Sequence, residues 1–150
     1  MKKILFVCLG NICRSPMAEF LLKDMVKKLK IEDDFFIESR ATSSEEVGNP
    51  VHYGTRNKLN ELGISTNGKT AQRLTKNDYD SFDYIIGMDN SNIRAINRII
   101  QDDKDSKVYR LLDFSDNPRD IEDPWYTGDF DTTYLDIKDG LDNFLHFIGY

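Results

Sequence analysis

Residues 4–16 read Ile4-Leu5-Phe6-Val7-Cys8-Leu9-Gly10-Asn11-Ile12-Cys13-Arg14-Ser15-Pro16. The apolar run at residues 4–7 is typical of a strand that is buried on both faces. Ser15-Pro16 predicts the start of a helix, because serine is a good N-cap and proline is favoured at the first helical position. Apolar residues then recur at helical spacing over residues 17–29. The stretch therefore predicts a strand, a short loop and a helix in immediate succession.

The same alternation continues to the end of the chain. Apolar runs predict further strands at residues 35–37, 84–88 and 108–112. Further helices are expected at 49–62, starting from Asn49-Pro50 with Tyr53, Leu59 and Leu62 inward, at 89–100 with Asp89 as cap, and at 134–148. Strands that alternate with helices favour an α/β fold with a four-stranded parallel sheet and helices on both faces. Ligands of such folds bind at the carboxyl ends of the strands, which is where Cys8 lies.

Length and composition indicate one folded domain, expected to span residues 1–150. Charged residues make up 31% of the chain and hydrophobic residues 39%, which excludes a disordered protein. Two cysteines and two histidines are too few for a disulfide scaffold or a typical structural zinc site, so no metal is expected. The sequence has neither a signal peptide nor an apolar stretch that could span a membrane. We therefore expect a cytoplasmic protein with no membrane partner.

The charge is acidic overall and unevenly distributed. The net charge is −6 and the pI is near 4.9, which argues against a nucleic-acid partner. Residues 1–30 nevertheless carry seven basic against two acidic side chains, whereas residues 113–143 carry ten acidic against two basic ones. Solvated helix faces and loops are the ordinary explanation of both runs.

The motif that carries chemistry is Cys8-x5-Arg14-Ser15, between the first strand and the first helix. Gly10 and Asn11 tolerate the positive φ that a tight loop needs, and such a loop can turn its N–H groups inward around an anion. The following helix contributes its N-terminal N–H groups, and Arg14 a planar fork for two phosphate oxygens. This field favours the thiolate of Cys8, which predicts a nucleophile directed at phosphorus. Ser15 can donate its hydroxyl to that sulfur.

A general acid is predicted at Asp123, in the acidic loop after the fourth strand. That loop should reach the same edge of the sheet as Cys8, and Pro124 would fix its backbone. Trp125 and Tyr126 follow at once and can form the walls of a slot for a phenyl ring. Taken alone, Asp-Pro is an ordinary turn signal.

With these residues in place, the chain resembles the low-molecular-weight protein tyrosine phosphatases over essentially its whole length. The matching segments, in the order and spacing of the family, are residues 7–15, 16–19, 41–43 with 48–50, 82–85 with 88–89, and 123–124. The resemblance implies the flavodoxin-like fold known as phosphotyrosine protein phosphatase I. It also implies hydrolysis of phosphotyrosine on proteins, and of small aryl phosphates, through a phosphocysteine intermediate and without a cofactor.

The resemblance also assigns roles to individual residues. Residues 8–15 form the phosphate-binding loop, in which Cys8 is the nucleophile and Arg14 clamps the phosphoryl group, while Asp123 is the acid. Asn11 and Ser39 match positions that hold the loop in shape. The substrate pocket is expected to include Trp125, Tyr126 and Glu45, of which Glu45 departs from the often aromatic residue of the family. Lys69 stands where many members have a histidine that supports the loop.

Cys13 keeps two interpretations: a redox guard that traps oxidised Cys8 as a disulfide, or a small packed hydrophobic residue. His52 and His146 are expected to be surface or packed residues. We expect phosphotyrosine proteins as partners and a monomer or weak self-association.

Three alternative functions stay open on the same fold. Arsenate reductases need further cysteines after the third strand, and residues 80–100 contain none. Protein arginine phosphatases resemble Gly-Asn-Thr-Cys in the loop, where this chain has Ile12, and lack the two aromatic residues after the acid. A phosphotyrosine-binding module without activity is the third alternative, although every chemical residue is present here.

Overall fold

A computed structural model describes residues 1–150. Its sheet has four strands, β1 (Lys2–Cys8), β2 (Phe35–Ala41), β3 (Tyr84–Gly87) and β4 (Val108–Arg110). The strands are all parallel, in the spatial order β2-β1-β3-β4. This confirms the predicted α/β fold with a four-stranded parallel sheet.

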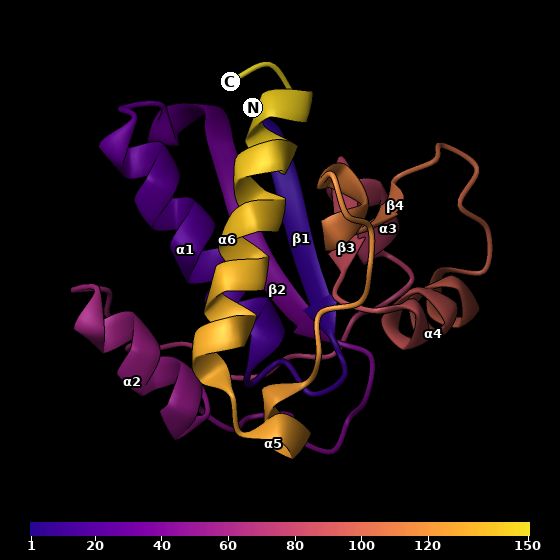
Figure 1. Cartoon of the computed structure of the whole chain (residues 1–150). Coiled ribbons are helices and arrows are strands. Elements are labelled where there is room, and N and C mark those ends of the chain that lie inside the picture. The colour runs from indigo at the N-terminus through magenta and orange to yellow at the C-terminus, as the bar shows by residue number, and fades with distance from the viewer.

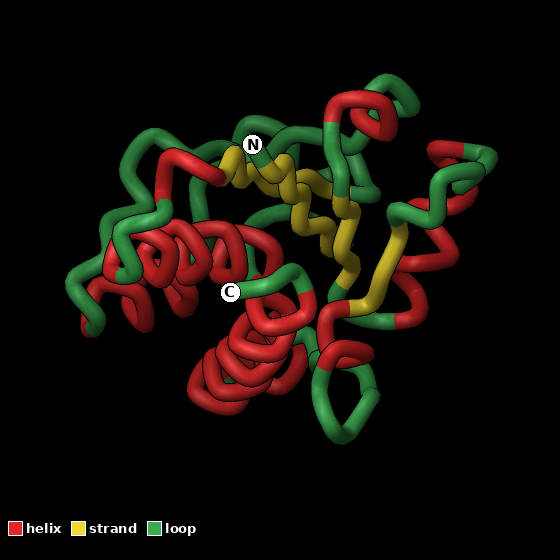
Figure 2. Tube along the Cα trace, turned by 90° about the horizontal axis from the view of Figure 1, so that it is seen from above, coloured by secondary structure: helices red, strands yellow, loops and turns green.

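Helices cover both faces of the sheet (Figure 2). One face carries α1 (Arg14–Lys28), α6 (Phe130–Phe147) and, beside them, α2 (Tyr53–Glu61). The other face carries α3 (Asp78–Ser81) and α4 (Asn90–Ile100), while the short α5 (Pro124–Thr127) lies beyond the end of the sheet. No helix has the length and the apolar character that crossing a membrane would require.

The central strand β1 supplies both halves of the core. Ile4, Phe6 and Cys8 face the cluster beneath α1 and α6, whereas Leu5 and Val7 face the cluster beneath α3 and α4. Successive side chains of a strand point to opposite faces, so an uninterrupted apolar run is what a strand covered on both sides needs.

Several element ends differ from the prediction. The second strand runs on to Ala41 because its polar residues still pair with β1, and the fourth ends at Arg110, after which Leu111–Phe114 form a 3₁₀ turn. Helix α1 begins at Arg14 with no side-chain cap, because the hydroxyl of Ser15 binds within the loop instead. Helix α2 begins only at Tyr53, which is exposed together with Leu62, so only Leu59 of the three predicted residues packs inward.

Strand order reverses between β1 and β3. The chain passes from β1 to β2 on one side and then crosses to β3 on the other, which leaves a crevice beyond the carboxyl ends of β1 and β3. Helix α5 lies at this end of the sheet, and both chain termini lie at the opposite end (Figure 1). The fold thus brings the loop after β1 and the segment before α5 to one place.

Candidate active site

The loop from Cys8 to Ser15 turns at Asn11, whose φ is +59°. Gly10 has no positive φ, so of the two residues that tolerate the left-handed region only Asn11 uses it. Asparagine tolerates that region because its short polar side chain can bond locally. Here the side chain is buried and bonded, which offsets the backbone cost.

The carbonyl groups of the loop face away from its centre. Those of Cys8 and Leu9 accept from Thr42 and Ser43, that of Ile12 accepts from the His52 N–H, and that of Cys13 from Met17 and the Thr55 hydroxyl. The N–H of Asn11 points to Cys8 Sγ at 3.3 Å. The N–H groups of residues 9, 10 and 12–15 donate to no acceptor within the protein. Such a ring of amides at a helix N-terminus is an anion cradle.

Hydrogen-bond directions around Asn11 define Cys8 Sγ as an acceptor. Asn11 Oδ1 accepts from the Gln72 N–H at 3.1 Å, so the Nδ2 side of the amide faces Ser15 Oγ and Ser39 Oγ, each at 2.8 Å. Ser15 Oγ therefore accepts from Asn11 and keeps one hydrogen to donate. Cys8 Sγ lies 3.0 Å from that oxygen, while the Arg40 carbonyl, at 3.5 Å, is the poorer acceptor. This arrangement suits a thiolate.

The hydrogen bonds continue from Ser39 to a buried ion pair between Glu19 and Lys69. Ser39 Oγ donates to Glu19 Oε1 at 2.5 Å, and Lys69 Nζ lies 3.1 Å from the same oxygen and 3.1 Å from the Ser39 carbonyl. Lys23 Nζ binds Glu19 Oε2 at 2.6 Å. Lys69 thus reaches the network that supports the loop, where the resemblance places a histidine.

Sequence reasoning gave Glu19 and Lys23 no role, although a signal was present. Ser15, Glu19 and Lys23 are spaced by four and lie on one face of α1.

Arg14 is almost fully buried and is held by one edge of its guanidinium group. Its Nη1 donates to Asp89 Oδ2 at 2.6 Å and to the Ile121 carbonyl at 2.9 Å. Burial alone would lower the pKa of Arg14, but the charges of Cys8, Asp89 and Asp123 together hold it above its ordinary value. The Nε and Nη2 edge remains for a phosphoryl group, since Nη2 meets only Asp123 Oδ2, at 3.4 Å.

Asp89 was predicted only as a helix cap. It does cap α4, through a bond from the Asn92 N–H to Oδ1 at 2.7 Å, and its other oxygen holds Arg14.

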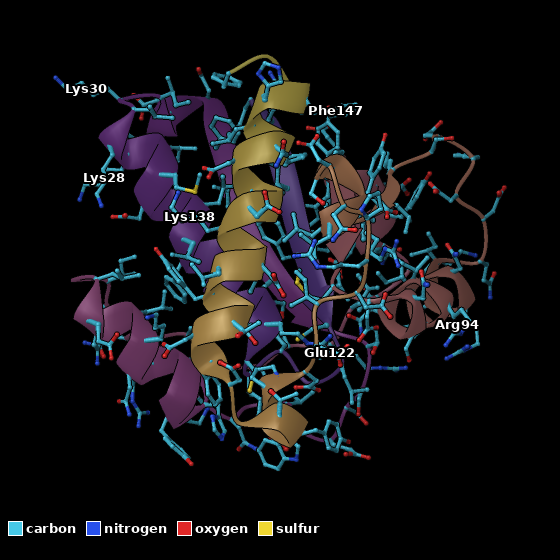
Figure 3. All side chains as sticks on the ribbon, viewed as in Figure 1. Lys28, Lys30, Arg94, Glu122, Lys138 and Phe147 are labelled. Atoms are coloured by element: carbon cyan, nitrogen blue, oxygen red, sulfur yellow. The ribbon has the colours of Figure 1, made fainter.

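Asp123 also divides its two oxygens between two tasks. Oδ1 accepts from the Trp125 N–H at 3.0 Å and so caps α5, of which Pro124 is the first residue. Oδ2 faces Arg14 and the pocket. Figure 3 labels the preceding residue, Glu122, on the segment that runs down to α5. Phe147 is labelled near the other end of the molecule. The turn after Asp123 therefore fixes one oxygen and leaves the other available.

These side chains surround a pocket of about 140 Å³. The structure brings Cys8, Arg14 and Asp123 together in it, with Glu45, Trp125 and Tyr126 at its wall; Asn11 and Ser15 lie behind it. Trp125 and Tyr126 are 57% and 78% exposed, so an aromatic substrate would bury apolar surface against them. Ser43 and Glu46 also line the pocket, and no sequence signal singled them out.

Cys13 lines the same pocket, and both cysteines are buried free thiols. Burial, and next the charge of Cys8, raise the pKa of Cys13 to about 12. Cys13 is therefore a neutral thiol close to Cys8 at physiological pH.

A thiol at the switch point of a parallel sheet, within an anion cradle and facing a buried arginine, defines an α/β phosphate-handling protein. The family model described as low molecular weight phosphotyrosine protein phosphatase matches residues 3–149. The chain belongs to this family.

Curated relatives and solved structures agree with this assignment. The low molecular weight protein-tyrosine-phosphatase YfkJ of Bacillus subtilis is 40% identical over 147 residues, 97% of this chain and 94% of the relative. Its crystal structure superposes with a TM-score of 0.95, covering 99% of this chain and 94% of that one. The Gallus gallus low molecular weight phosphotyrosine protein phosphatase is 44% identical over 89% of this chain and 87% of its own. The drosophila arginine phosphatase DARP has a TM-score of 0.91 at 32% identity, covering 100% of this chain and 99% of that one.

Proposed function

We propose that this protein hydrolyses phosphotyrosine on proteins, and small aryl phosphates as surrogates, through a phosphocysteine intermediate on Cys8. The observation that carries the proposal is the loop itself. Cys8 Sγ accepts from the Asn11 N–H and from Ser15, and unpaired amides and Arg14 converge on the same space. This array would bind a phosphate dianion and present it to the sulfur.

In the first half of the reaction, the Cys8 thiolate attacks phosphorus and the bond from phosphorus to the phenolic oxygen breaks. The free edge of Arg14 would hold two equatorial oxygens, and its bonds to Asp89 and Ile121 would keep it in place. Asp123 gives the proton of Oδ2 to the leaving phenolate. A positioned general acid contributes about 10²–10⁴-fold to such a step.

In the second half, Asp123 takes a proton from water as that water attacks the phosphocysteine. The sulfur–phosphorus bond breaks, and the electron pair returns to Cys8. The Ser15 hydroxyl, 3.0 Å from Cys8 Sγ, would stabilise the thiolate as it leaves. Inorganic phosphate is the product.

The pocket wall supports tyrosine as the phosphorylated residue. Trp125 and Tyr126 present exposed aromatic surface beside Arg14 and Asp123, where the phenyl ring of a phosphotyrosine could stack. Phosphoserine is shorter and would leave its phosphate above the nucleophile. Glu45 would favour a basic residue in the substrate peptide.

Phosphoarginine is the second candidate substrate, because the chain is also similar to DARP, which is named an arginine phosphatase. Ile12 in the loop and the aromatic pair after Asp123 favour phosphotyrosine. Rates on phosphotyrosine, phosphoarginine and phosphoserine peptides of matched sequence decide between them. Phosphotyrosine should be turned over fastest, and a faster phosphoarginine reaction would reassign the substrate.

We further propose that Cys13 guards the nucleophile by forming a disulfide with Cys8 after Cys8 has been oxidised to the sulfenic acid, with release of water. The pocket that both cysteines line supports this role. Peroxide-inactivated protein should regain activity with dithiothreitol. The Cys13→Ser variant should recover less. Two free cysteines also suit the reducing cytoplasm, which we propose as the location, with the protein acting as a monomer or weakly associated.

Replacement of the nucleophile tests the mechanism. Cys8→Ser should abolish turnover of p-nitrophenyl phosphate while the circular dichroism spectrum stays unchanged. Wild-type protein mixed rapidly with that substrate should release a burst of nitrophenol with phosphate held on Cys8. Retained turnover in Cys8→Ser would overturn the mechanism.

A further inference from the structure

His52 lies between the two segments that carry the reacting groups. It is half-buried and is the residue before α2. Its backbone N–H donates to the Ile12 carbonyl of the phosphate-binding loop at 2.8 Å. Three residues later, the Thr55 hydroxyl donates to the Cys13 carbonyl at 3.1 Å. The start of α2 thus holds two loop carbonyls outward, which leaves the neighbouring amides free to face the pocket.

The side chain of His52 contacts the other segment. Its ring stacks on Phe130, the first residue of α6, with centroids 5.5 Å apart and planes within 8°. It also meets Trp125 edge-on, at 5.4 Å and 69°. Trp125 is a wall of the pocket, and its backbone N–H donates to Asp123 Oδ1. The imidazole therefore contacts Trp125, the residue whose backbone N–H orients the proposed acid.

Gly54 makes this packing possible. A Cβ atom at Gly54 would lie 2.3 Å from two atoms of the Phe130 ring. The absence of a side chain lets Phe130 lie directly on the first turn of α2, where it supports the face of His52. Phe130 also packs against the buried Ile12, Cys13 and Ala71 behind the loop.

The orientation of the imidazole is set by helix capping. His52 Nδ1 accepts from the Gly54 N–H at 3.1 Å, which fixes the ring rotation. Asparagine and aspartate are the preferred residues at this position, so capping alone does not call for a ring. The contacts with Phe130 and Trp125 use the aromatic ring that histidine has and asparagine lacks.

We infer that His52 is a positioning residue, which sets Trp125 and through it the Asp123 segment relative to the phosphate-binding loop. The inference rests on the proposed function for its kinetic consequence. His52 does not line the pocket and so acts through Trp125 rather than on the substrate. Displacement of an acid by about 1 Å can cost on the order of 10²-fold in rate, so loss of the ring should be measurable.

Three variants separate the ring from the cap. His52→Asn keeps an acceptor for Gly54 and removes the ring, whereas His52→Phe keeps a ring and removes the acceptor. His146→Asn is the control, because His146 is exposed near the far end of α6. Trp125 is the only tryptophan, so intrinsic fluorescence reports its surroundings without any substrate.

His52→Asn should shift the emission of Trp125 and increase its quenching by acrylamide. It should lower kcat/KM for phenyl phosphate, whose leaving group needs the acid, by about tenfold or more, with much less effect on p-nitrophenyl phosphate. For His52→Phe, kcat/KM should stay within about threefold of the wild-type value on both substrates, because the ring still holds Trp125 and the proposed acid stays in place. His146→Asn should match wild type throughout.

Unchanged Trp125 fluorescence in His52→Asn would overturn the inference. Equal losses of kcat/KM on phenyl phosphate and p-nitrophenyl phosphate would overturn it as well. A loss in His52→Phe as large as that in His52→Asn would show that a ring at this position does not hold Trp125 in place, and would overturn the inference as well. If His52→Asn does not fold, His52→Gln takes its place under the same criteria. A wild-type protein without phosphatase activity would refute the proposed function, while the fluorescence comparison would still decide whether His52 positions Trp125.

Discussion

Both the oxygen and the nitrogen of the Asn11 side chain form hydrogen bonds. Its oxygen accepts from Gln72, its nitrogen donates to Ser15 and Ser39, and its backbone takes the left-handed turn of the loop. Because the two donated bonds leave Ser15 free to donate to Cys8, one buried asparagine fixes both the shape of the cradle and the direction of the bond between Ser15 and Cys8.

At the residue scale, Asp123→Ala should slow aryl phosphates with poor leaving groups the most. The proposed proton transfer from Asp123 matters in proportion to the basicity of the departing oxygen, so the loss on phenyl phosphate should be about 10²-fold or more. Values of kcat/KM on a series of substituted phenyl phosphates measure this, because they report the steps up to departure of the phenol. A uniform loss across the series would remove Asp123 from the role of acid.

Lys69 gives a second prediction at this scale. Lys69→Met removes one of two cations from Glu19, whose side chain is only 2% exposed, and leaves Lys23 as its partner. We expect the free energy of unfolding to fall by about 1–3 kcal/mol, less than for complete loss of a buried pair. Urea denaturation measures it.

Lys28→Met is the matched control, because Lys28 pairs with Asp24 on the surface of α1, the helix that also carries Glu19. It should leave stability unchanged. Equal losses in the two variants would show that Lys69 contributes no more than a surface charge.

At the scale of elements, α6 is fitted closely against the 3₁₀ turn after β4. A Cβ atom at Gly140 would lie 2.5 Å from Cγ of the fully buried Leu111. Gly140→Ala should therefore destabilise the protein by up to about 2 kcal/mol, since overpacking costs about 1–3 kcal/mol and the gain in helix propensity is about 1 kcal/mol. Thermal unfolding shows whether the melting temperature of Gly140→Ala falls below that of the wild type. The neighbouring exposed Asp139→Ala is the control, and stabilisation by Gly140→Ala would contradict the close fit.

Tyr79 joins α3 to the loop before β4. Its hydroxyl donates to Asp103 at 2.7 Å and accepts from the Asp105 N–H at 2.8 Å. Burial, followed by the bond to Asp103, raises the pKa of Tyr79 to about 12.

This shift predicts a loss of stability in alkali. An unfolded tyrosine loses its proton near pH 10, while the folded one keeps it to about pH 12. Between these values the unfolded chain binds fewer protons, so the contribution of Tyr79 to stability is complete below about pH 10 and decreases as the pH rises. Urea denaturation from pH 8 to 11 should give a flatter decline for Tyr79→Phe. The same slope in both proteins would contradict this assignment.

At the scale of the whole molecule, β1 contributes to the cores on both faces of the sheet. Neither core can be lost without exposing this strand, so we propose that residues 1–150 form one domain and unfold as one unit. Calorimetry should give a single transition with an enthalpy of about 100 kcal/mol near 60 °C, equal to the van't Hoff value. Two resolved transitions would contradict a single domain.

Local patterns predicted much of this molecule, because they depend on neighbours in the chain. The apolar run before Cys8 favours a buried strand, and Asp89 was identified as a cap from its position alone. The structure confirms both. Ser15 shows where such reasoning fails. Its sequence position suits a helix cap, yet its hydroxyl binds Cys8 and Asn11, because a loop that turns back on itself offers partners that the linear order does not show.

The sequence by itself determined the order of the four strands and the four longer helices, the parallel sheet and the loop that carries Cys8 and Arg14, since each follows from patterns of apolar and polar residues along the chain. It did not predict the short helices α3 and α5. Only the tertiary structure decided which distant side chains meet: Asp89 and Asp123 on Arg14, Lys69 on Glu19, and His52 between Phe130 and Trp125. These contacts join residues up to 109 apart in the chain. They arise because parallel strands deliver the loops that follow them to one edge of the sheet, where packing, rather than order along the chain, selects the partners.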